Sequence, residues 1–245
     1  MKQKKGRAGK IRLIHYRDFD HQTVRHRVIG GWLKKLCQDL PECLVVDWSC
    51  GSGIGAQTLR TKYPSWKFLM TDVVDTRNQS ADLPFTLLDG DLPRLPLADA
   101  SVNVVLCSEV LEHVHNLTAT IREIRRILVP GGLLVGSIPN FRNLASRFSF
   151  VRRGLYRIGG KYEGGGHVNY ITPEFLTNFV SDHFTFVRQG GDVDWLTWVD
   201  FVGFRRAEKV YRSLDFKGLI RENPRYSPLL SYDFLFAYRK KSADL

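Results

Sequence analysis

The chain has 245 residues, of which 43% are hydrophobic and 25% are charged, so it is long enough for one large α/β domain and too apolar for a wholly disordered protein. Its 36 Lys and Arg outnumber its 25 Asp and Glu, which gives a net charge of +11 at pH 7. No apolar run approaches the roughly 20 residues that span a bilayer, and no apolar stretch follows the first basic residues, so neither a membrane-spanning helix nor a secretory leader is predicted.

The predicted elements of the first half of the chain alternate between strand and helix. Residues 1–20 read as a basic tail, and the helically spaced apolar side chains that follow predict an amphipathic helix over 21–37. Short β-branched runs after it predict buried strands, and the segment between the first two runs has a helical pattern. The strands are predicted at 43–48, 66–72, 85–91 and 102–108, and the helix at 54–62.

The second half continues the alternation and then changes. A helix over 117–128 is ended by Pro130-Gly131-Gly132, and Thr172 followed by Pro173 and Glu174 is typical of a helix start. Helices are predicted at 117–128, 141–157 and 172–184, and strands at 133–139, 184–189 and 232–240. We also expect an aromatic-rich helical insertion over 194–214.

This order of elements predicts an α/β fold, a Rossmann-like, doubly wound sheet of seven mostly parallel strands. Helices cover both of its faces, and its last strand is antiparallel. We expect a single domain over residues 21–245, in which residues 141–170 form a lid over the substrate.

The net positive charge is concentrated in two segments. Residues 1–36 hold eleven Lys and Arg against two Asp, and residues 142–161 hold six cations and no acid. The two segments predict contact with an anionic partner or a membrane surface, although solvated surface residues give the same pattern. Four cysteines without a Cys-x-x-Cys pair indicate reduced thiols and a cytoplasmic protein. If the basic segments contact a membrane, the protein is expected at its inner face.

The loop after the first strand favours one ligand over another. Residues 51–56, GSGIGA, fit the Gly-x-Gly-x-x-Gly/Ala fingerprint of a dinucleotide site. However, Asp47 just before the loop would repel a pyrophosphate. A ligand with a cationic centre and an amino group, such as S-adenosylmethionine, would be attracted by this acid.

Two more acids follow later strands. Asp72 closes the second predicted strand, where a carboxylate can accept both hydroxyls of a ribose. Asp91 closes the third, where a carboxylate can take an adenine amino group while Leu92 packs on the ring. Either acid alone fits an ordinary turn. Three acids at successive strand ends predict a ligand site, because open α/β sheets bind ligands outside the carboxyl ends of their strands.

Three ordered blocks resemble class I S-adenosylmethionine-dependent methyltransferases. The blocks are VVDWSCGSG, GDLPRLPLADASVNVVLCSEVLEHV and EIRRILVPGGLLVGSIPN, and the match runs from about residue 43 to 140. It is closest to the branch with ubiquinone-biosynthesis O-methyltransferases and methionine-biosynthesis W-type proteins. The resemblance implies an enzyme with S-adenosyl-L-methionine as its cofactor. By the same resemblance, the cofactor-binding residues are Asp47, Ser49, Gly51, Gly53, Asp72, Asp91, Leu92, Ser108 and Glu109.

Two positions depart from the family pattern. Ser49 stands where the first glycine of the loop is usual, so the turn must adopt a backbone conformation that serine tolerates. Val102 and Asn103 replace the usual Phe-Asp before the fourth strand. Because of these departures, a non-catalytic protein that binds S-adenosylmethionine or a partner remains an alternative.

Two histidines are the candidate catalytic residues. His113 follows the fourth strand, and His167 matches a substrate-side histidine of the family branch. A neutral imidazole near pH 7 suits a general base, but the same residues fit a helix cap and a pinned loop. The remaining histidines lack metal-ligand spacing, so no metal is predicted.

The predicted reaction is methyl transfer to an oxygen, or less favourably a nitrogen or carbon. The acceptor is a small molecule or a lipid- or sugar-linked molecule, anionic if the cations of residues 142–161 contact it. RNA is a third-ranked acceptor because no RNA-binding module is recognisable, and nucleic acid is therefore not predicted as a partner. An NAD-dependent oxidoreductase is opposed by Asp47 and by the Pro-Gly-Gly block.

Overall fold

The computed structural model describes residues 21–77, 82–90, 93–154, 166–191, 231 and 233–242. The basic tail, Asp91, Leu92 and the insertion predicted over 194–214 lie outside these residues, as does the lid segment 155–165. No helix among the described residues is long and apolar enough to cross a bilayer.

The described residues form five helices and seven strands. The helices are α1 (His21–Leu36), α2 (Ile54–Lys62), α3 (Leu117–Ile127), α4 (Leu144–Arg153) and α5 (Pro173–Val180). The strands are β1 (Leu44–Trp48), β2 (Lys67–Asp72), β3 (Phe85–Leu87), β4 (Val102–Ser108), β5 (Leu128–Pro139), β6 (Phe184–Gly191) and β7 (Asp233–Lys240).

The seven strands lie in one sheet with the order β3-β2-β1-β4-β5-β7-β6. Strands β1 to β5 pair in parallel, and β7 is antiparallel to both of its neighbours, β5 and β6. The predicted fold class is therefore confirmed, including the antiparallel last strand. The sheet order reverses direction between β1 and β4, and ligands of such sheets bind at this point, outside the carboxyl ends of the strands.

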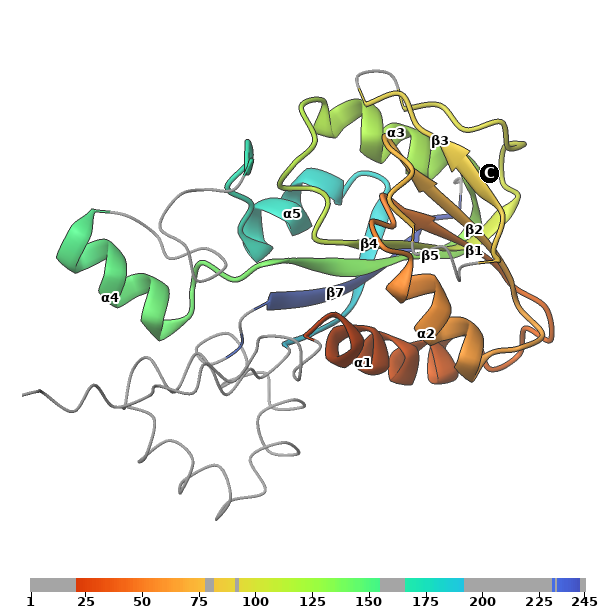
Figure 1. Ribbon diagram of the computed structural model, residues 1–245, viewed down its shortest axis with the longest axis horizontal. Coiled ribbons are helices and arrows are strands. Elements are labelled where there is room, and N and C mark those ends of the chain that lie inside the picture. The colour runs from red at the N-terminus through yellow and green to blue at the C-terminus, as the bar shows by residue number, and fades with distance from the viewer. Residues whose placement is uncertain are drawn as a thin grey trace, which may run out of the picture.

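Helices cover both faces of the sheet (Figure 1). On one face, Ile29 and Leu33 of α1 and Leu59 of α2 pack on the apolar side chains of β1, β2 and β4. On the other face, Ile124 of α3 and Leu176 of α5 join a second cluster with side chains of β4, β5 and β7. Helix α4 projects away from both layers (Figure 1).

Several predicted boundaries were wrong. Helix α4 covers only Leu144–Arg153 of the helix predicted over 141–157. Strand β5 begins at Leu128 and includes the Pro-Gly-Gly segment, because Leu128 already pairs with Val102 before a register shift. Strand β3 ends at Leu87, so Asp91 follows the strand by several residues and does not close it. Helix α5 begins after its Thr172 cap as predicted, but it ends at Val180.

Candidate functional site

The loop after β1 turns sharply into α2 through three residues with positive φ. Gly51 has φ 52° and Gly53 φ 78°, and Ser49 has φ 54°, in the left-handed region. Side chains other than glycine, asparagine and aspartate rarely adopt this region. The structure thus places Ser49 in the conformation that the usual glycine would adopt freely, at a cost in backbone strain.

Gly55 is required where α1, β1 and β4 meet at the start of α2. A Cβ atom on Gly55 would lie 2.9 Å from Oδ2 of Asp47, 2.9 Å from Cδ2 of Leu106 and 3.0 Å from Nε2 of His26. These distances are too short for carbon contacts. Gly55, which is not itself a defined position of the fingerprint, therefore serves close packing of the loop and needs no phosphate to explain it.

Asp47 is buried beneath the loop, with 4% of its surface exposed. Its Oδ2 accepts the backbone N–H of Ala56 at 2.8 Å, which holds the first turn of α2 against β1. Burial raises the pKa of Asp47 to about 7, the Ala56 N–H opposes the shift, and the charge of Asp72 adds to it. Asp47 thus positions the loop; its attraction for a cationic ligand stays a prediction.

Asp72 fastens the tip of the same loop to the end of β2. Its Oδ2 accepts the N–H of Gly51 at 2.8 Å, and its Oδ1 accepts the N–H of Val73 at 2.7 Å. Each carboxylate oxygen has a further lone pair that can accept a hydroxyl. Asp72 is the last residue of β2, as predicted, and it remains partly exposed. A ribose could therefore reach its carboxylate, and the role of Asp72 in binding the ribose stays a prediction.

Ser108 and Glu109, at the end of β4, are held by residues of other elements. Ser108 Oγ lies 3.3 Å from Nε2 of His26 in α1. Glu109 has a positive φ of 55°, and its Oε1 accepts the hydroxyl of Ser137 at 2.8 Å and lies 3.3 Å from Nη1 of Arg25. Burial is the largest cause that raises the pKa of Glu109 to about 8, and the charge of Asp233 acts in the same direction.

Arg25 of α1 joins three elements beneath the site. Besides Glu109, its Nη1 contacts Oδ2 of the buried Asp233 of β7 at 3.0 Å and donates to Oγ of Ser137 of β5 at 3.2 Å. Sequence reasoning missed Arg25, His26 and Asp233. Their local sequence carries no signal, because Arg25 and His26 belong to the polar run 25–27 of the first helix and their partners are far away in the chain.

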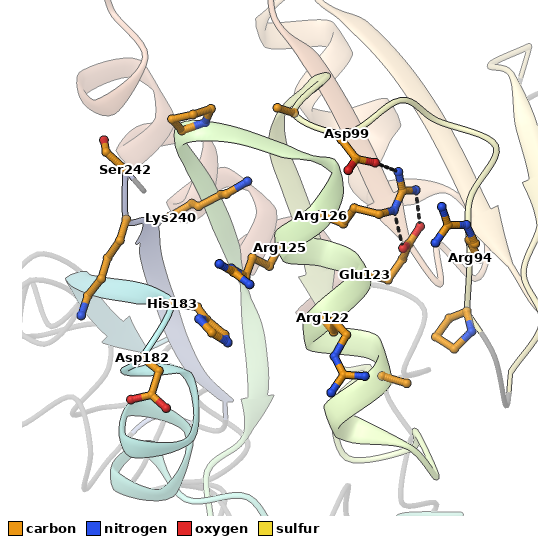
Figure 2. Close-up of a pocket in the computed structure, with 15 residues that line it drawn as sticks. Arg94, Asp99, Arg122, Glu123, Arg125, Arg126, Asp182, His183, Lys240 and Ser242 are labelled. Carbon is orange, nitrogen blue, oxygen red and sulfur yellow. Dashed lines mark hydrogen bonds and ion pairs between the residues drawn. The ribbon is translucent and has the colours of Figure 1, made fainter. Parts of the chain in front are cut away.

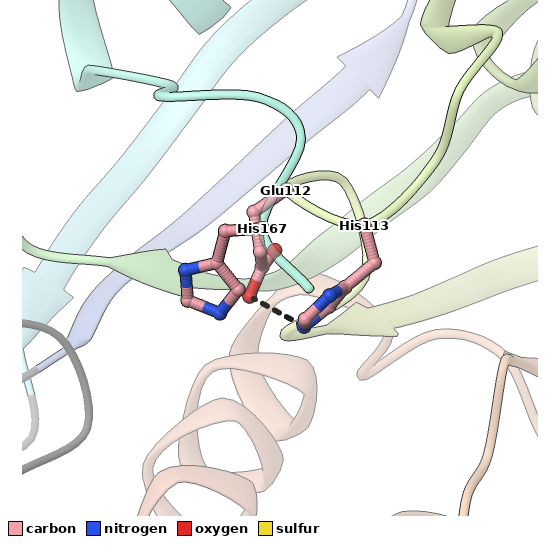
Figure 3. A group of neighbouring side chains, drawn as sticks. All are labelled: Glu112, His113 and His167. Atoms are coloured by element: carbon pink, nitrogen blue, oxygen red, sulfur yellow. Dashed lines mark ion pairs between the residues drawn. The ribbon is translucent and has the colours of Figure 1, made fainter. Parts of the chain in front are cut away.

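The two candidate catalytic histidines lie side by side. Their ring centroids are 4.5 Å apart and their planes meet at 74°. Nε2 of His113 is 3.9 Å from Oε1 of Glu112, a fully buried acid. Figure 3 shows the Glu112 carboxylate between the two rings. Sequence reasoning named both histidines but missed Glu112.

Backbone hydrogen bonds bring His167 to His113 over a long sequence separation. The N–H groups of Val168 and Asn169 both donate to the carbonyl oxygen of Glu112, at 2.8 and 3.0 Å. The Asn169 side chain donates to two further carbonyls of the same turn, at 3.1 and 2.7 Å. Nδ1 of His113 also contacts the carbonyl of Gly166 at 3.2 Å. The segment after the glycine-rich loop is thus pinned to the turn after β4.

Helix α4, inside the predicted lid, displays apolar side chains. Phe148, Phe150 and Val151 are exposed, and Asn143 caps the helix by accepting the N–H of Ser146 at 2.7 Å. Arg142 forms an ion pair with Glu174 of α5. The mixture of exposed apolar side chains and cations that the sequence indicated is present over the described part of the lid.

A separate cavity of about 840 Å³ lies at the opposite, amino edge of the sheet. Arg122, Arg125 and Arg126 of α3, together with Lys240 at the end of β7, give it a cationic lining (Figure 2). Arg126 is paired with Glu123 and Asp99. None of the predicted site residues lines this cavity.

Comparison with known proteins matches the region that holds the site. Residues 46–136 match the family model described as a methyltransferase domain. A probable S-adenosylmethionine-dependent methyltransferase of Mycolicibacterium smegmatis is 32% identical over 117 residues, which cover 47% of this chain and 44% of that protein.

Two further relatives are named for their acceptors. A malonyl-[acyl-carrier protein] O-methyltransferase of Dechloromonas aromatica is 30% identical over 41% of this chain and 39% of the relative. A demethylmenaquinone methyltransferase of Deinococcus radiodurans is 33% identical over 55% of this chain and 61% of the relative. The chain thus spans less than two thirds of the length of each curated relative.

A solved structure supports the fold over a longer range. A SAM-dependent methyltransferase of Archaeoglobus fulgidus superposes with a TM-score of 0.57 at 15% identity, covering 92% of this chain and all of the other. The predicted resemblance is therefore confirmed: residues 46–136 match the methyltransferase-domain family model and are similar to S-adenosylmethionine-dependent methyltransferases.

Proposed function

We propose that the protein transfers a methyl group from S-adenosyl-L-methionine to an oxygen of a small-molecule, lipid-linked or sugar-linked acceptor. The hydrogen bond from the Gly51 N–H to Asp72 carries the proposal. It fixes the glycine loop at the end of β2 and leaves carboxylate lone pairs that can accept hydroxyl groups of a ligand. The methyltransferase relatives support the same cofactor.

The cofactor residues of the proposal are those at the carboxyl ends of β1, β2 and β4. Gly51 and Gly53 let the backbone approach the ligand, Asp72 accepts the ribose hydroxyls, and Asp47 lies beneath as a carboxyl that ionises near neutral pH. The predicted set of cofactor-binding residues is completed by Asp91, Leu92, Ser49, Ser108 and Glu109. S-adenosylmethionine, when bound, supplies a methyl group on a positively charged sulfur.

The proton of the acceptor is taken up at the group formed by Glu112, His113 and His167. His113 donates from Nδ1 to the Gly166 carbonyl, which leaves the lone pair on Nε2. Burial, with the nearby His113, lowers the pKa of His167 and favours its neutral form. Neutral imidazoles accept protons near pH 7, which supports the predicted general-base role.

An oxygen acceptor is supported by a relative that is named as an O-methyltransferase of malonyl-[acyl-carrier protein]. The exposed Phe148, Phe150 and Val151 on α4, with cations in the same segment, suit an acceptor that combines apolar and anionic parts. The same mixture suits contact with an anionic membrane surface.

Binding and transfer measurements test the proposal together. Isothermal titration should show binding of S-adenosylmethionine and S-adenosylhomocysteine but not of NAD. Labelled cofactor incubated with fractionated lipids, sugars and RNA should label a lipid or sugar fraction. Cofactor binding without any labelled product would favour the non-catalytic alternative, and binding of NAD alone would overturn the cofactor assignment.

A further inference from the structure

The cavity at the amino edge of the sheet holds more positive than negative charge. Six Lys and Arg side chains and three Asp and Glu side chains line it, which leaves a net charge of +3 around a space of about 840 Å³. The six cations are Arg94, Arg122, Arg125, Arg126, Lys240 and Lys241. Like charges around one concave space raise the positive potential there and attract anions.

Two of the three acids are already compensated by one arginine. All five N–H groups of Arg126 are engaged, because they donate to the carboxylates of Glu123 and Asp99 and to the carbonyl oxygens of Leu95 and Leu97. Glu123 also accepts the N–H of Leu95 at 2.8 Å. Arg126 thus fixes the segment before β4 against α3 and keeps no donor for a ligand. The charges that remain around the cavity are five cations and one acid.

Three of these five cations are exposed arginines without an ion pair in the part of the chain that the structure describes: Arg94, Arg122 and Arg125. Arg122 and Arg125 are three residues apart in α3, so they lie on the same face of the helix. A cation in the last turn, such as Arg125, complements the helix dipole. Arg122 lies in the middle of the helix, so the dipole does not account for the pair.

Lys240 brings a further cation from the end of β7 towards Arg125. Its Nζ donates to the carbonyl oxygen of Leu128 at 2.6 Å, which leaves two N–H groups for other acceptors. Burial and then the charge of Arg125 lower the pKa of Lys240, and Asp99, which acts in the opposite direction, is already paired with Arg126. The two cations therefore repel each other, and an anion bound between them would relieve this repulsion.

We propose that this cavity binds a small anion with two phosphate groups, held by Arg122, Arg125 and Lys240. Figure 2 shows the two arginines extending from α3 and the lysine from the end of β7. A phosphate group carries a charge of about −1.5 to −2 at neutral pH, so two groups compensate the net charge of +3. Arginine and lysine are the usual partners of phosphate oxygens. The volume of about 840 Å³ is also typical of a small-molecule site.

The composition of the lining favours a small ligand over a nucleic acid. Phe, Tyr and Trp are absent from the described residues that line the cavity, whereas proteins that bind single strands stack the bases on such side chains. The apolar part of the lining consists of small residues, namely Pro93, Ala100, Ala119 and Pro130. Inorganic pyrophosphate, or a diphosphate with a small organic part, matches this lining.

The ligand contacts α3 on one side and the end of the last strand on the other. The N–H of Lys241 donates to the carbonyl oxygen of His183 at 2.9 Å, which fixes the end of β7 beside the start of β6. A bound diphosphate therefore links the last strand to α3 and stabilises the folded chain. None of the residues proposed for the cofactor or for the acceptor proton lines this cavity, so the site is independent of the methyl transfer.

The test is an isothermal titration of the full chain with inorganic pyrophosphate at about 0.15 M salt, which screens loose contacts with the basic tail. We expect one bound pyrophosphate per chain and a rise in melting temperature. Arg122→Ala and Lys240→Met should each weaken binding by at least about tenfold, since each removes a charge-assisted hydrogen bond. Arg27→Ala is the matched control, because Arg27 is an exposed helical arginine outside the cavity, and its affinity should equal that of the wild type.

Three results would overturn the proposal. The wild-type chain binds no pyrophosphate, or Arg122→Ala and Lys240→Met bind it as tightly as the wild type, or Arg27→Ala weakens binding as much as they do. A single-stranded oligonucleotide that binds more tightly than pyrophosphate, and loses this binding in Arg122→Ala, would replace the small ligand by a nucleic acid. The affinity for S-adenosylhomocysteine should be unchanged in all three variants, which shows that they are folded and that the two sites are separate.

Discussion

Ser49 keeps a non-glycine side chain at φ 54° in the loop that approaches the proposed cofactor. The left-handed region costs an L-residue roughly 1–2 kcal/mol, and the greater freedom of glycine in the unfolded chain offsets part of the difference. We expect Ser49→Gly to raise the free energy of unfolding by up to about 1 kcal/mol in urea titrations.

Ser52 offers a matched control for this change. It lies in the same loop and is exposed, but it does not have a positive φ. Ser52→Gly should therefore leave the stability unchanged or lower it slightly. Equal effects of both substitutions would show that backbone strain at Ser49 is not what the first one relieves.

Asp72 is the residue on which cofactor binding should depend most. Asp72→Ala removes the acceptor for the Gly51 N–H as well as the proposed ribose contact, so we expect at least about a hundredfold loss of affinity for S-adenosylhomocysteine, consistent with two lost charge-assisted hydrogen bonds. Isothermal titration measures this. Asp75→Ala, which removes an exposed acid that pairs with Arg77, is the control, and unchanged affinity in Asp72→Ala would exclude the ribose role.

The raised pKa of Asp47 implies that the free energy of unfolding depends on pH. Its pKa is raised from 3.8 to about 7 in the folded protein, so the folded state binds a proton that the unfolded state has released. This contribution to stability is fully present below about pH 4 and is lost as the pH rises through 7. Asp47→Asn keeps an acceptor for the Ala56 N–H but cannot ionise.

Urea unfolding at pH 5 and pH 8 tests the prediction. The stability of Asp47→Asn relative to the wild type should be higher at pH 8 than at pH 5, because only the wild type carries a buried charge there. Other acids, such as Glu109, titrate in both proteins and cancel in the comparison. A difference that is equal at the two pH values would show that Asp47 is already ionised in the folded protein at pH 5, so that its pKa is not raised.

At the scale of elements, helix α1 is held to the site by charge as well as by apolar packing. Arg25 is buried between Glu109 and Asp233. Arg25→Met would leave these acids without their cation, and breaking a buried ion pair costs about 3–5 kcal/mol. We expect a loss of this size in urea unfolding, and Arg27→Ala, an exposed neighbour in the same helix, should change the stability little.

Adding Asp233→Asn to Arg25→Met distinguishes charge from packing. If the unpaired carboxylate causes the loss, the double variant should recover part of the stability. If it recovers none, the loss reflects the packing of the arginine stem between α1 and the sheet.

The elements that could be predicted are those whose signal is local. The β-branched run 102–108 and the helix 54–62 have the predicted bounds, since periodicity and flanking residues decide them. The start of β5 could not be predicted in this way, because its pairing with β4 overrides the turn tendency of Pro130 and Gly131. Pairing between strands is not visible in either sequence segment alone.

The same distinction holds for the site. The acids Asp47 and Asp72 were found because each lies next to a recognisable strand, and the structure places both at the glycine loop. The contact of Arg25 with Asp233 joins opposite ends of the described chain, and the approach of His167 to Glu112 depends on backbone hydrogen bonds. No spacing in the sequence carries this information.

At the scale of the whole molecule, the cationic surfaces are separate from the proposed cofactor site. The proposed cofactor residues lie at the carboxyl edge of the sheet, whereas the cavity lined by the arginines of α3 lies at the amino edge (Figure 2). The strongly basic residues 1–12 lie outside the described residues, and they are expected to act on partners rather than on the cofactor.

Deletion of residues 1–12 tests this separation. We expect an unchanged affinity for S-adenosylhomocysteine and weaker binding to vesicles that contain anionic lipids, with a reduced dependence on salt because fewer cations take part. Vesicles of neutral lipid are the control. A deletion that abolishes binding of S-adenosylhomocysteine would place the tail in the cofactor site.

The position of β7 between β5 and β6 has a consequence for biosynthesis. The ribosome makes β7 after both of its neighbours, so the edge of β5 stays open and β6 has no place in the sheet until residues 233–240 emerge. A nascent or truncated chain that stops earlier presents an unpaired strand edge, which is a template for aggregation. The carboxylate that anchors Arg25 arrives with the same strand, so the site becomes complete only at this late step.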